Sequence, residues 1–233
     1  IKAVTPPVDK WPTWTGDITA GLTSSHGNTR SRDTNFRTKL QRITTHDKLT
    51  LSAETARSSQ EDPDTEEDVV TEDWWKTRAK YEYSGAKKLS IYGKAAIESD
   101  SVSELDRRTI LGGGFGYNWI ESDKMNLSTE AGFAQLTETF DNKSKDNREH
   151  SIDLGYYFDK KINSKLSFIN ELSWYLSAQD TSSYLLSSTA ELRASLTEDI
   201  FTNFRVILDY DSTPAKETKK TDVKYILGCG YNF

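Results

Sequence analysis

The sequence predicts an all-β protein, a transmembrane antiparallel up-and-down β-barrel of about 12 strands. Three observations predict this fold. Polar and apolar residues alternate with a period of two along most of the chain. Tight turns alternate with longer polar connections, as they do in membrane barrels. Aromatic residues gather near the ends of the alternating stretches, where a membrane strand meets the lipid headgroups.

Composition limits the choice of fold. The chain has 233 residues, which suits one large domain or one barrel. Only 35% of residues are hydrophobic, and no apolar run approaches the ~20 residues of a membrane-spanning helix. A membrane β-strand also has a polar average, because one of its faces lines the lumen. The net charge of −6 without a basic block argues against nucleic acid as a partner.

The period-two stretches give the strand boundaries. We expect residues 1–13 to form a periplasmic N-terminal tail or linker and residues 14–233 to form an outer-membrane barrel with both termini on the periplasmic side. The strands are predicted at residues 14–24, 30–43, 48–58, 73–83, 88–99, 107–120, 125–139, 149–160, 165–178, 183–196, 201–211 and 221–233.

The connections between these strands alternate in length. Tight turns are predicted at residues 44–47, 84–87, 121–124, 162–165 and 197–200. Polar loops are predicted after the third, fifth, seventh and eleventh strands, and the connections after the first and ninth strands are shorter exceptions. The longest loop is predicted at residues 59–72, a strongly acidic segment. Short turns on one rim and longer loops on the other are typical of bacterial barrels.

Alternation does not by itself say which face is inside, and a soluble lipocalin-type barrel would place the apolar face inward. Three features favour lipid outside. About 12 long strands enclose too wide a space for a dry core. Small residues such as Ala131 and Ala190 occupy the middle of the apolar face. Aromatic residues also form two girdles. The predicted girdle residues are Trp14, Trp75, Tyr83, Tyr117, Trp119, Tyr156, Phe158, Trp174, Tyr184 and Tyr210.

The polar face then lines the lumen and carries charges of both signs. The predicted lumen-lining residues are Arg37, Lys39, Lys76, Arg78, Lys80, Glu130, Asp153, Glu171, Glu191, Arg193 and Arg205. Two interpretations stay open. The charges could create a transverse field that orients a passing solute, or they could pair across the lumen and plug it. Pairing of Lys76, Arg78 and Lys80 with Glu130, Asp153 and Glu171 would favour the plug.

The last strand ends in an aromatic residue. Tyr225, Leu227, Tyr231 and Phe233 share one face, with Phe233 as the final residue. This arrangement resembles the C-terminal signal that the barrel-assembly machinery recognises in outer-membrane proteins. We therefore expect that machinery as a partner during biogenesis, together with outer-membrane lipid and lipopolysaccharide.

Three segments carry a family resemblance: WTGDITAGLTSSHGNTRSRD at residues 14–33, LGGGFGYNW at residues 111–119, and the terminal Phe233. They resemble the YdiY-like family of salt-induced outer-membrane proteins, also called domain of unknown function 481. The resemblance covers residues 14–233, and its most specific part is Gly27, Asn28 and Thr29. It implies a barrel in the outer membrane of a Gram-negative-type bacterium and brings no catalytic residues.

Site hypotheses beyond the lumen are weaker. A lipid hydrolase needs a serine and a histidine within reach of each other, but His150 and its neighbour Ser151 point to opposite faces of a strand. The carboxylates of residues 61–72 could bind Ca²⁺, although their spacing matches no EF-hand and a solvated loop is the simpler interpretation. We expect no enzyme activity, cofactor or metal.

The leading functional expectation is an outer-membrane protein of structural or porin-like type, a narrow passive channel. The alternative is a barrel subunit or scaffold of a larger cell-envelope complex, with an envelope protein as partner. An outer-membrane lipid-modifying enzyme comes third.

Overall fold

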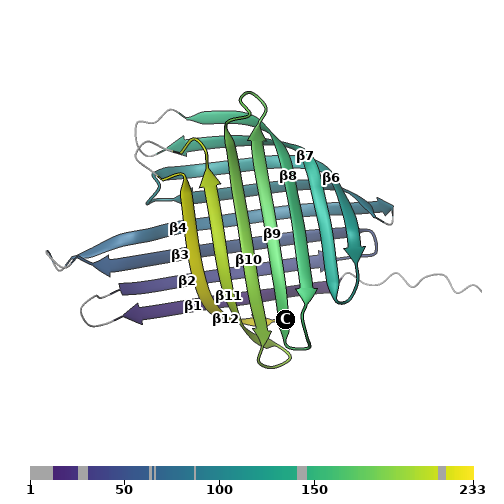
Figure 1. Cartoon of the computed structure of the whole chain (residues 1–233), viewed down its shortest axis with the longest axis horizontal. Coiled ribbons are helices and arrows are strands. Elements are labelled where there is room, and N and C mark those ends of the chain that lie inside the picture. The colour runs from purple at the N-terminus through teal and green to yellow at the C-terminus, as the bar shows by residue number, and fades with distance from the viewer. Residues whose placement is uncertain are drawn as a thin grey trace, which may run out of the picture.

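A computed structural model describes residues 13–25, 31–62, 65, 67–86, 88–140, 146–214 and 219–233. Each strand pairs antiparallel with the next along the chain, and the last pairs with the first, so the sheet closes into a barrel (Figure 1). The 12 strands are β1 (Thr13–Ser25), β2 (Ser31–Ile43), β3 (Asp47–Glu61), β4 (Asp68–Ala86), β5 (Leu89–Asp100), β6 (Leu105–Glu121), β7 (Met125–Phe140), β8 (Asn147–Lys161), β9 (Leu166–Ser177), β10 (Tyr184–Ser195), β11 (Ile200–Asp211) and β12 (Thr221–Asn232). The predicted fold class is confirmed.

The sequence prediction was wrong about the acidic segment at residues 59–72. There β3 and β4 extend past their predicted ends and pair from Ser59↔Val70 to Glu61↔Asp68. Only residues 62–67 connect the two strands. The acidic composition concealed the strand, because an extended strand near the rim can carry charge on both of its faces when both are solvated.

The connections still alternate in length. Those on the rim that includes the β2–β3 turn contain two to four residues, and those on the opposite rim contain four to nine. We call these the short-turn rim and the long-loop rim. The longest connection joins β11 to β12, not β3 to β4 as predicted. Thr13 belongs to β1, so the expected tail loses its last residue to the barrel, and residues 1–12 lie outside the described residues.

The two faces of the sheet differ sharply in character. Large apolar side chains stand exposed on the outer face, among them Phe133 at 74% and Leu22 at 75%. Charged side chains lie buried inside, with Asp153 at 0% and Arg205 at 1%. A water-soluble protein has the opposite arrangement, so this surface suits hydrocarbon. The described residues include no helix long and apolar enough to cross a bilayer.

The barrel contains apolar clusters inside the lumen as well. In Figure 1, β1 to β4 run across the view while β8 to β12 run more upright, so the two walls cross each other. Trp74 and Ala56 from one wall pack against Ile207 and Ile226 from the other. Trp74 is 1% exposed. These contacts hold the two walls together at this height and reduce the open cross-section.

The barrel closes through a short seam between β1 and β12. β1 pairs with β2 along its whole length, but with β12 only from Asp17↔Asn232 to Ala20↔Cys229. At the short-turn rim the seam is completed by two backbone hydrogen bonds between Gly16 and Phe233, at 2.8 and 3.0 Å. β1 and β12 therefore pair through backbone hydrogen bonds only near the short-turn rim, within the residues that the structure describes.

Candidate functional site

The lumen holds a cavity of about 520 Å³. Its lining begins at Pro214 and Asp222 near the long-loop rim and reaches Lys48 and Glu82 near the short-turn rim. Cations and carboxylates contribute to the lining in nearly equal number. A cavity with this extent and lining can hold water and a small polar solute along most of the barrel.

The structure gives a position for each predicted lumen residue. Asp153 is fully buried inside the barrel and does not line the cavity. The others line the cavity: Arg37, Lys39, Lys76, Arg78, Lys80, Glu130, Glu171, Glu191, Arg193 and Arg205.

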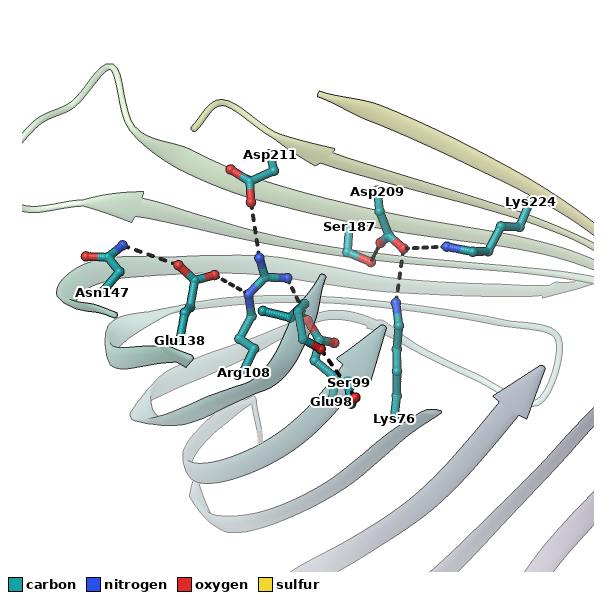
Figure 2. A network of polar contacts seen from close by, with 11 residues as sticks. Lys76, Glu98, Ser99, Arg108, Glu138, Asn147, Ser187, Asp209, Asp211 and Lys224 are labelled. Carbon is teal, nitrogen blue, oxygen red and sulfur yellow. Dashed lines mark hydrogen bonds and ion pairs between the residues drawn. The ribbon is translucent and has the colours of Figure 1, made fainter. Parts of the chain in front are cut away.

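Arg108 is the centre of an ion-pair network near the long-loop rim (Figure 2). Its guanidinium donates to Glu98 at 2.8 Å and to Glu138 at 2.5 Å, from the strands on either side. It also donates to Asp211 of β11 at 3.1 Å, on the opposite wall. Because three carboxylates surround one planar cation, the network fixes the guanidinium in place across the lumen.

A second network lies beside it and joins the same two walls (Figure 2). Lys76 of β4 donates to Asp209 of β11 at 3.0 Å, and Ser187 donates to the other oxygen of that carboxylate at 2.6 Å. Lys224 lies 3.9 Å from Asp209. The ammonium groups of Lys76 and Lys224 also lie over the Trp74 ring, at 5.3 and 5.4 Å from its centroid. Polar and apolar contacts thus reinforce each other at this crossing.

A third group of contacts ties β5 to β8. Tyr92 and Lys94 both donate to the buried carboxylate of Asp153, each at 2.7 Å. Gly132 makes room for this contact, because a Cβ there would lie 2.8 Å from the Tyr92 hydroxyl. Lys94 also lies over the Tyr175 ring, 4.7 Å from its centroid. The Asp153 charge is therefore compensated, as a buried carboxylate requires.

Further ion pairs join β1–β3 to β9–β11, and some of the same residues also pair within one wall. Arg37 lies 3.2 Å from both Asp17 and Glu191. Arg193 pairs with Glu191 at 2.9 Å. Further pairs join Arg205 with Glu54, and Lys39 with Glu171 at 3.5 Å. Opposite charges on facing walls therefore compensate one another along the lumen.

The pairing differs from the one that the sequence suggested. Lys80 does pair with Glu130. Lys76 instead pairs with Asp209, while Asp153 pairs with Lys94 and Glu171 with Lys39. Arg78 has no ion pair or hydrogen bond with any residue that the structure describes. The lumen is crossed by ion pairs, yet a cavity remains between them.

The aromatic residues predicted for the girdles cluster in two groups. Near the short-turn rim, the rings of Tyr117 and Trp119 lie 4.7 Å apart, and Trp14 and Tyr83 are exposed on the outer face. Near the long-loop rim, Tyr184 contacts both Trp174 and Tyr210, and Trp75 is exposed. Phe158 lies beside Phe168, and the Tyr156 hydroxyl donates to Asn170.

The proposed assembly signal lies on the outer face of β12 and its terminus. Tyr225 and Leu227 are 71% and 70% exposed, and Tyr231 and Phe233 are about half exposed. The four side chains are therefore accessible from the membrane side.

The alternative sites gain no support from the geometry. Ser151 is buried inside the barrel, while His150 on the adjacent position points outward. His46 lies in the β2–β3 turn, and His26 lies outside the described residues. In the acidic segment, Glu72 accepts hydrogen bonds from Ser58 at 3.0 Å and the Trp74 indole at 2.6 Å. Among the described residues no group of histidine, cysteine and carboxylate side chains is arranged to hold a metal ion.

Sequence reasoning missed Arg108, Tyr92 and Trp74 as lumen residues. Arg108 shares its face of β6 with Ile110, an apolar residue that is itself buried inside the barrel. Trp74 stands next to Trp75, and only the strict alternation from Lys76 could have indicated that Trp74 faces inward. Inward apolar residues thus concealed the polar pattern at these positions.

Several solved structures of outer-membrane proteins resemble this fold. NanC porin superposes with a TM-score of 0.55 at 11% identity, over 93% of this chain and 98% of that chain. The COG4313 outer-membrane channel from Pseudomonas putida F1 gives 0.52 at 10% identity, over 98% of both chains. KdgM porin gives 0.47 at 13% identity, over 95% of this chain and 99% of that chain. No curated protein sequence matches the chain.

The likenesses to NanC porin and to the COG4313 channel show the fold, which this chain shares with bacterial outer-membrane porins and channels. The apolar outer face agrees with that membrane location, so the chain is a barrel of the bacterial outer membrane, as predicted. The family model described as "Protein of unknown function, DUF481" matches residues 18–233. Within this range, Gly27, Asn28 and Thr29 lie outside the described residues. By this match over nearly the whole barrel, the chain belongs to the DUF481 family.

Proposed function

We propose that the protein is a narrow passive channel for small polar solutes across the outer membrane. The observation that carries the proposal is the cavity of about 520 Å³, whose lining extends from near one rim to near the other. A barrel that serves only as a membrane anchor has no need of a hydrated interior. The likeness in fold to a porin and to an outer-membrane channel supports the same function.

The ion pairs across the lumen give the proposed channel its narrowness. Arg108 and Lys76, which lie side by side, and Lys39 each contact a carboxylate on the opposite wall. Because most of these side chains are largely buried and held in ion pairs, they keep the lumen narrow, and the cavity that remains between them limits the size of the solutes that the proposed channel admits. The proposal includes no catalytic step. It places the short-turn rim, where β1 begins and β12 ends, in the periplasm.

Liposome swelling tests this function. Proteoliposomes with purified protein should swell in solutions of small sugars and amino acids, at rates that fall steeply as solute size rises. Empty liposomes and liposomes with heat-denatured protein serve as controls. Swelling that is equal to these controls for every solute would contradict the channel function.

A further inference from the structure

Arg78 is the one strand cation lining the cavity that forms no ion pair with a residue that the structure describes. It lies on β4 between Lys76 and Lys80, and all three side chains line the cavity. Lys76 pairs with Asp209 and Lys80 with Glu130. Arg78 is exposed to the lumen and forms no ion pair or hydrogen bond with any residue of the described ranges.

The register of the sheet explains this isolation. Lys76 stands between Glu54 on β3 and Glu98 on β5. Arg78 stands between Ser52 on β3 and Ala96 on β5, which are short and uncharged. No carboxylate therefore stands directly beside Arg78 in the register. Glu98, Glu171 and Asp209 act on its charge electrostatically, but each is held in an ion pair with another cation and none lies within ion-pair distance of Arg78.

A guanidinium that has no ion-pair or hydrogen-bond partner and lies in a confined space is suited to bind an anion. Its planar array of N–H groups matches the two oxygens of a carboxylate or phosphate, and it keeps its charge at any physiological pH. Hydroxyl groups of Ser52, Ser173 and Thr189 line the same cavity and can donate further hydrogen bonds. The cavity of about 520 Å³ is within the range of small-molecule sites, about 300–1,000 Å³.

We propose that Arg78 is the anion-binding residue of the lumen and makes the channel select small oxyanions, solutes that carry a carboxylate or phosphate group. This inference rests on the proposed channel function and adds its solute class. The other lumen cations contribute less to selectivity, because carboxylates of this chain already neutralise them.

Reversal potentials of the protein in planar bilayers test the selectivity. A gradient of potassium chloride, acetate or phosphate is applied to the wild type, to R78Q and to R57Q. Arg57 is the matched control, because its exposed side chain pairs with Asp73 at 4.0 Å and does not line the cavity. The wild type and R57Q should prefer anions, and R78Q should lose that preference while it still conducts. The acetate and phosphate gradients show which oxyanion is preferred.

An unchanged reversal potential in R78Q would overturn the assignment and leave the channel function standing. If the wild type does not conduct, the channel function fails, and calorimetric titration of the detergent-solubilised protein with acetate and with phosphate tests Arg78 separately. Binding to the wild type and R57Q that weakens by about 10- to 100-fold in R78Q, as loss of a charged hydrogen bond implies, supports the site. No binding to the wild type, or equal binding to R78Q, overturns it.

Discussion

Arg108 shows how one side chain can narrow a barrel. Three carboxylates surround its guanidinium, and one of them, Asp211, lies 103 residues further along the chain on the opposite wall. The side chain is only 15% exposed. Because the cation is shared by β5, β7 and β11, it both crosses the lumen and joins the walls near the long-loop rim.

Truncation of this side chain should widen the channel and weaken the barrel. In R108A the bridge to Asp211 is lost, and Glu98 and Glu138 are left close together without their cation. Single-channel conductance should therefore rise. The free energy of unfolding should fall, by less than the about 3–5 kcal/mol of a fully buried pair, because the lumen is hydrated.

R107A provides the matched control for R108A. Arg107 is the preceding residue, is exposed, and does not line the cavity. Its truncation should leave both conductance and stability near their wild-type values. If R108A conducts no better than R107A, then Arg108 does not limit the channel.

At this scale the sequence indicates the face of a side chain but not its partner. Alternation places Lys76 on the lumen side, yet Lys76 and Asp209 lie 133 residues apart. Their contact depends on the tilt of the strands and on how closely the two walls approach. Those quantities come from the register of all the strand pairs together, which no short segment of sequence determines.

Among the secondary-structure elements, the strands were well predicted and the connections less so. The period-two pattern located each strand, because lipid and lumen impose opposite polarity on its two faces. It failed near the rims, where both faces meet water. The acidic segment at residues 59–72 is the clearest case, since most of it is strand.

The seam between β1 and β12 can be tested with the native cysteine. Ala20 lies directly opposite Cys229 in the register, and both side chains belong to the outer face. Hydrogen-bonded and non-hydrogen-bonded pairs alternate along an antiparallel ladder. Gly16–Phe233 is a hydrogen-bonded pair and Ala20–Cys229 lies four residues further along β1, so Ala20–Cys229 is also a hydrogen-bonded pair, with a Cα separation of about 5.5 Å. That separation is within the range that a disulfide spans.

Oxidation of A20C should therefore form a disulfide that locks the barrel closed. Because it closes a very long loop, it should stabilise the folded protein by about 4–5 kcal/mol in the chain-entropy description. Electrophoresis of denatured, unreduced protein reveals the bond as a shift in mobility. I18C is the control, because Ile18 lies opposite Tyr231 and should not react with Cys229. Equal cross-linking of both variants would contradict the register of the seam.

The whole molecule combines a lipid-facing exterior with an interior that is neither open nor filled. Contacts between facing walls, such as Trp74 with Ile207 and Lys39 with Glu171, divide the lumen. The cavity continues past them from near one rim to near the other. The barrel therefore has a constricted lumen, neither wide open nor filled, which is the feature that the proposed channel requires.

Single-channel recording of the wild-type protein in a planar bilayer tests this description most directly. A constricted, continuous lumen predicts discrete current steps that are small and that grow when Arg108 is truncated. Well-inserted protein that gives no discrete steps at any voltage, in both the wild type and R108A, would contradict it.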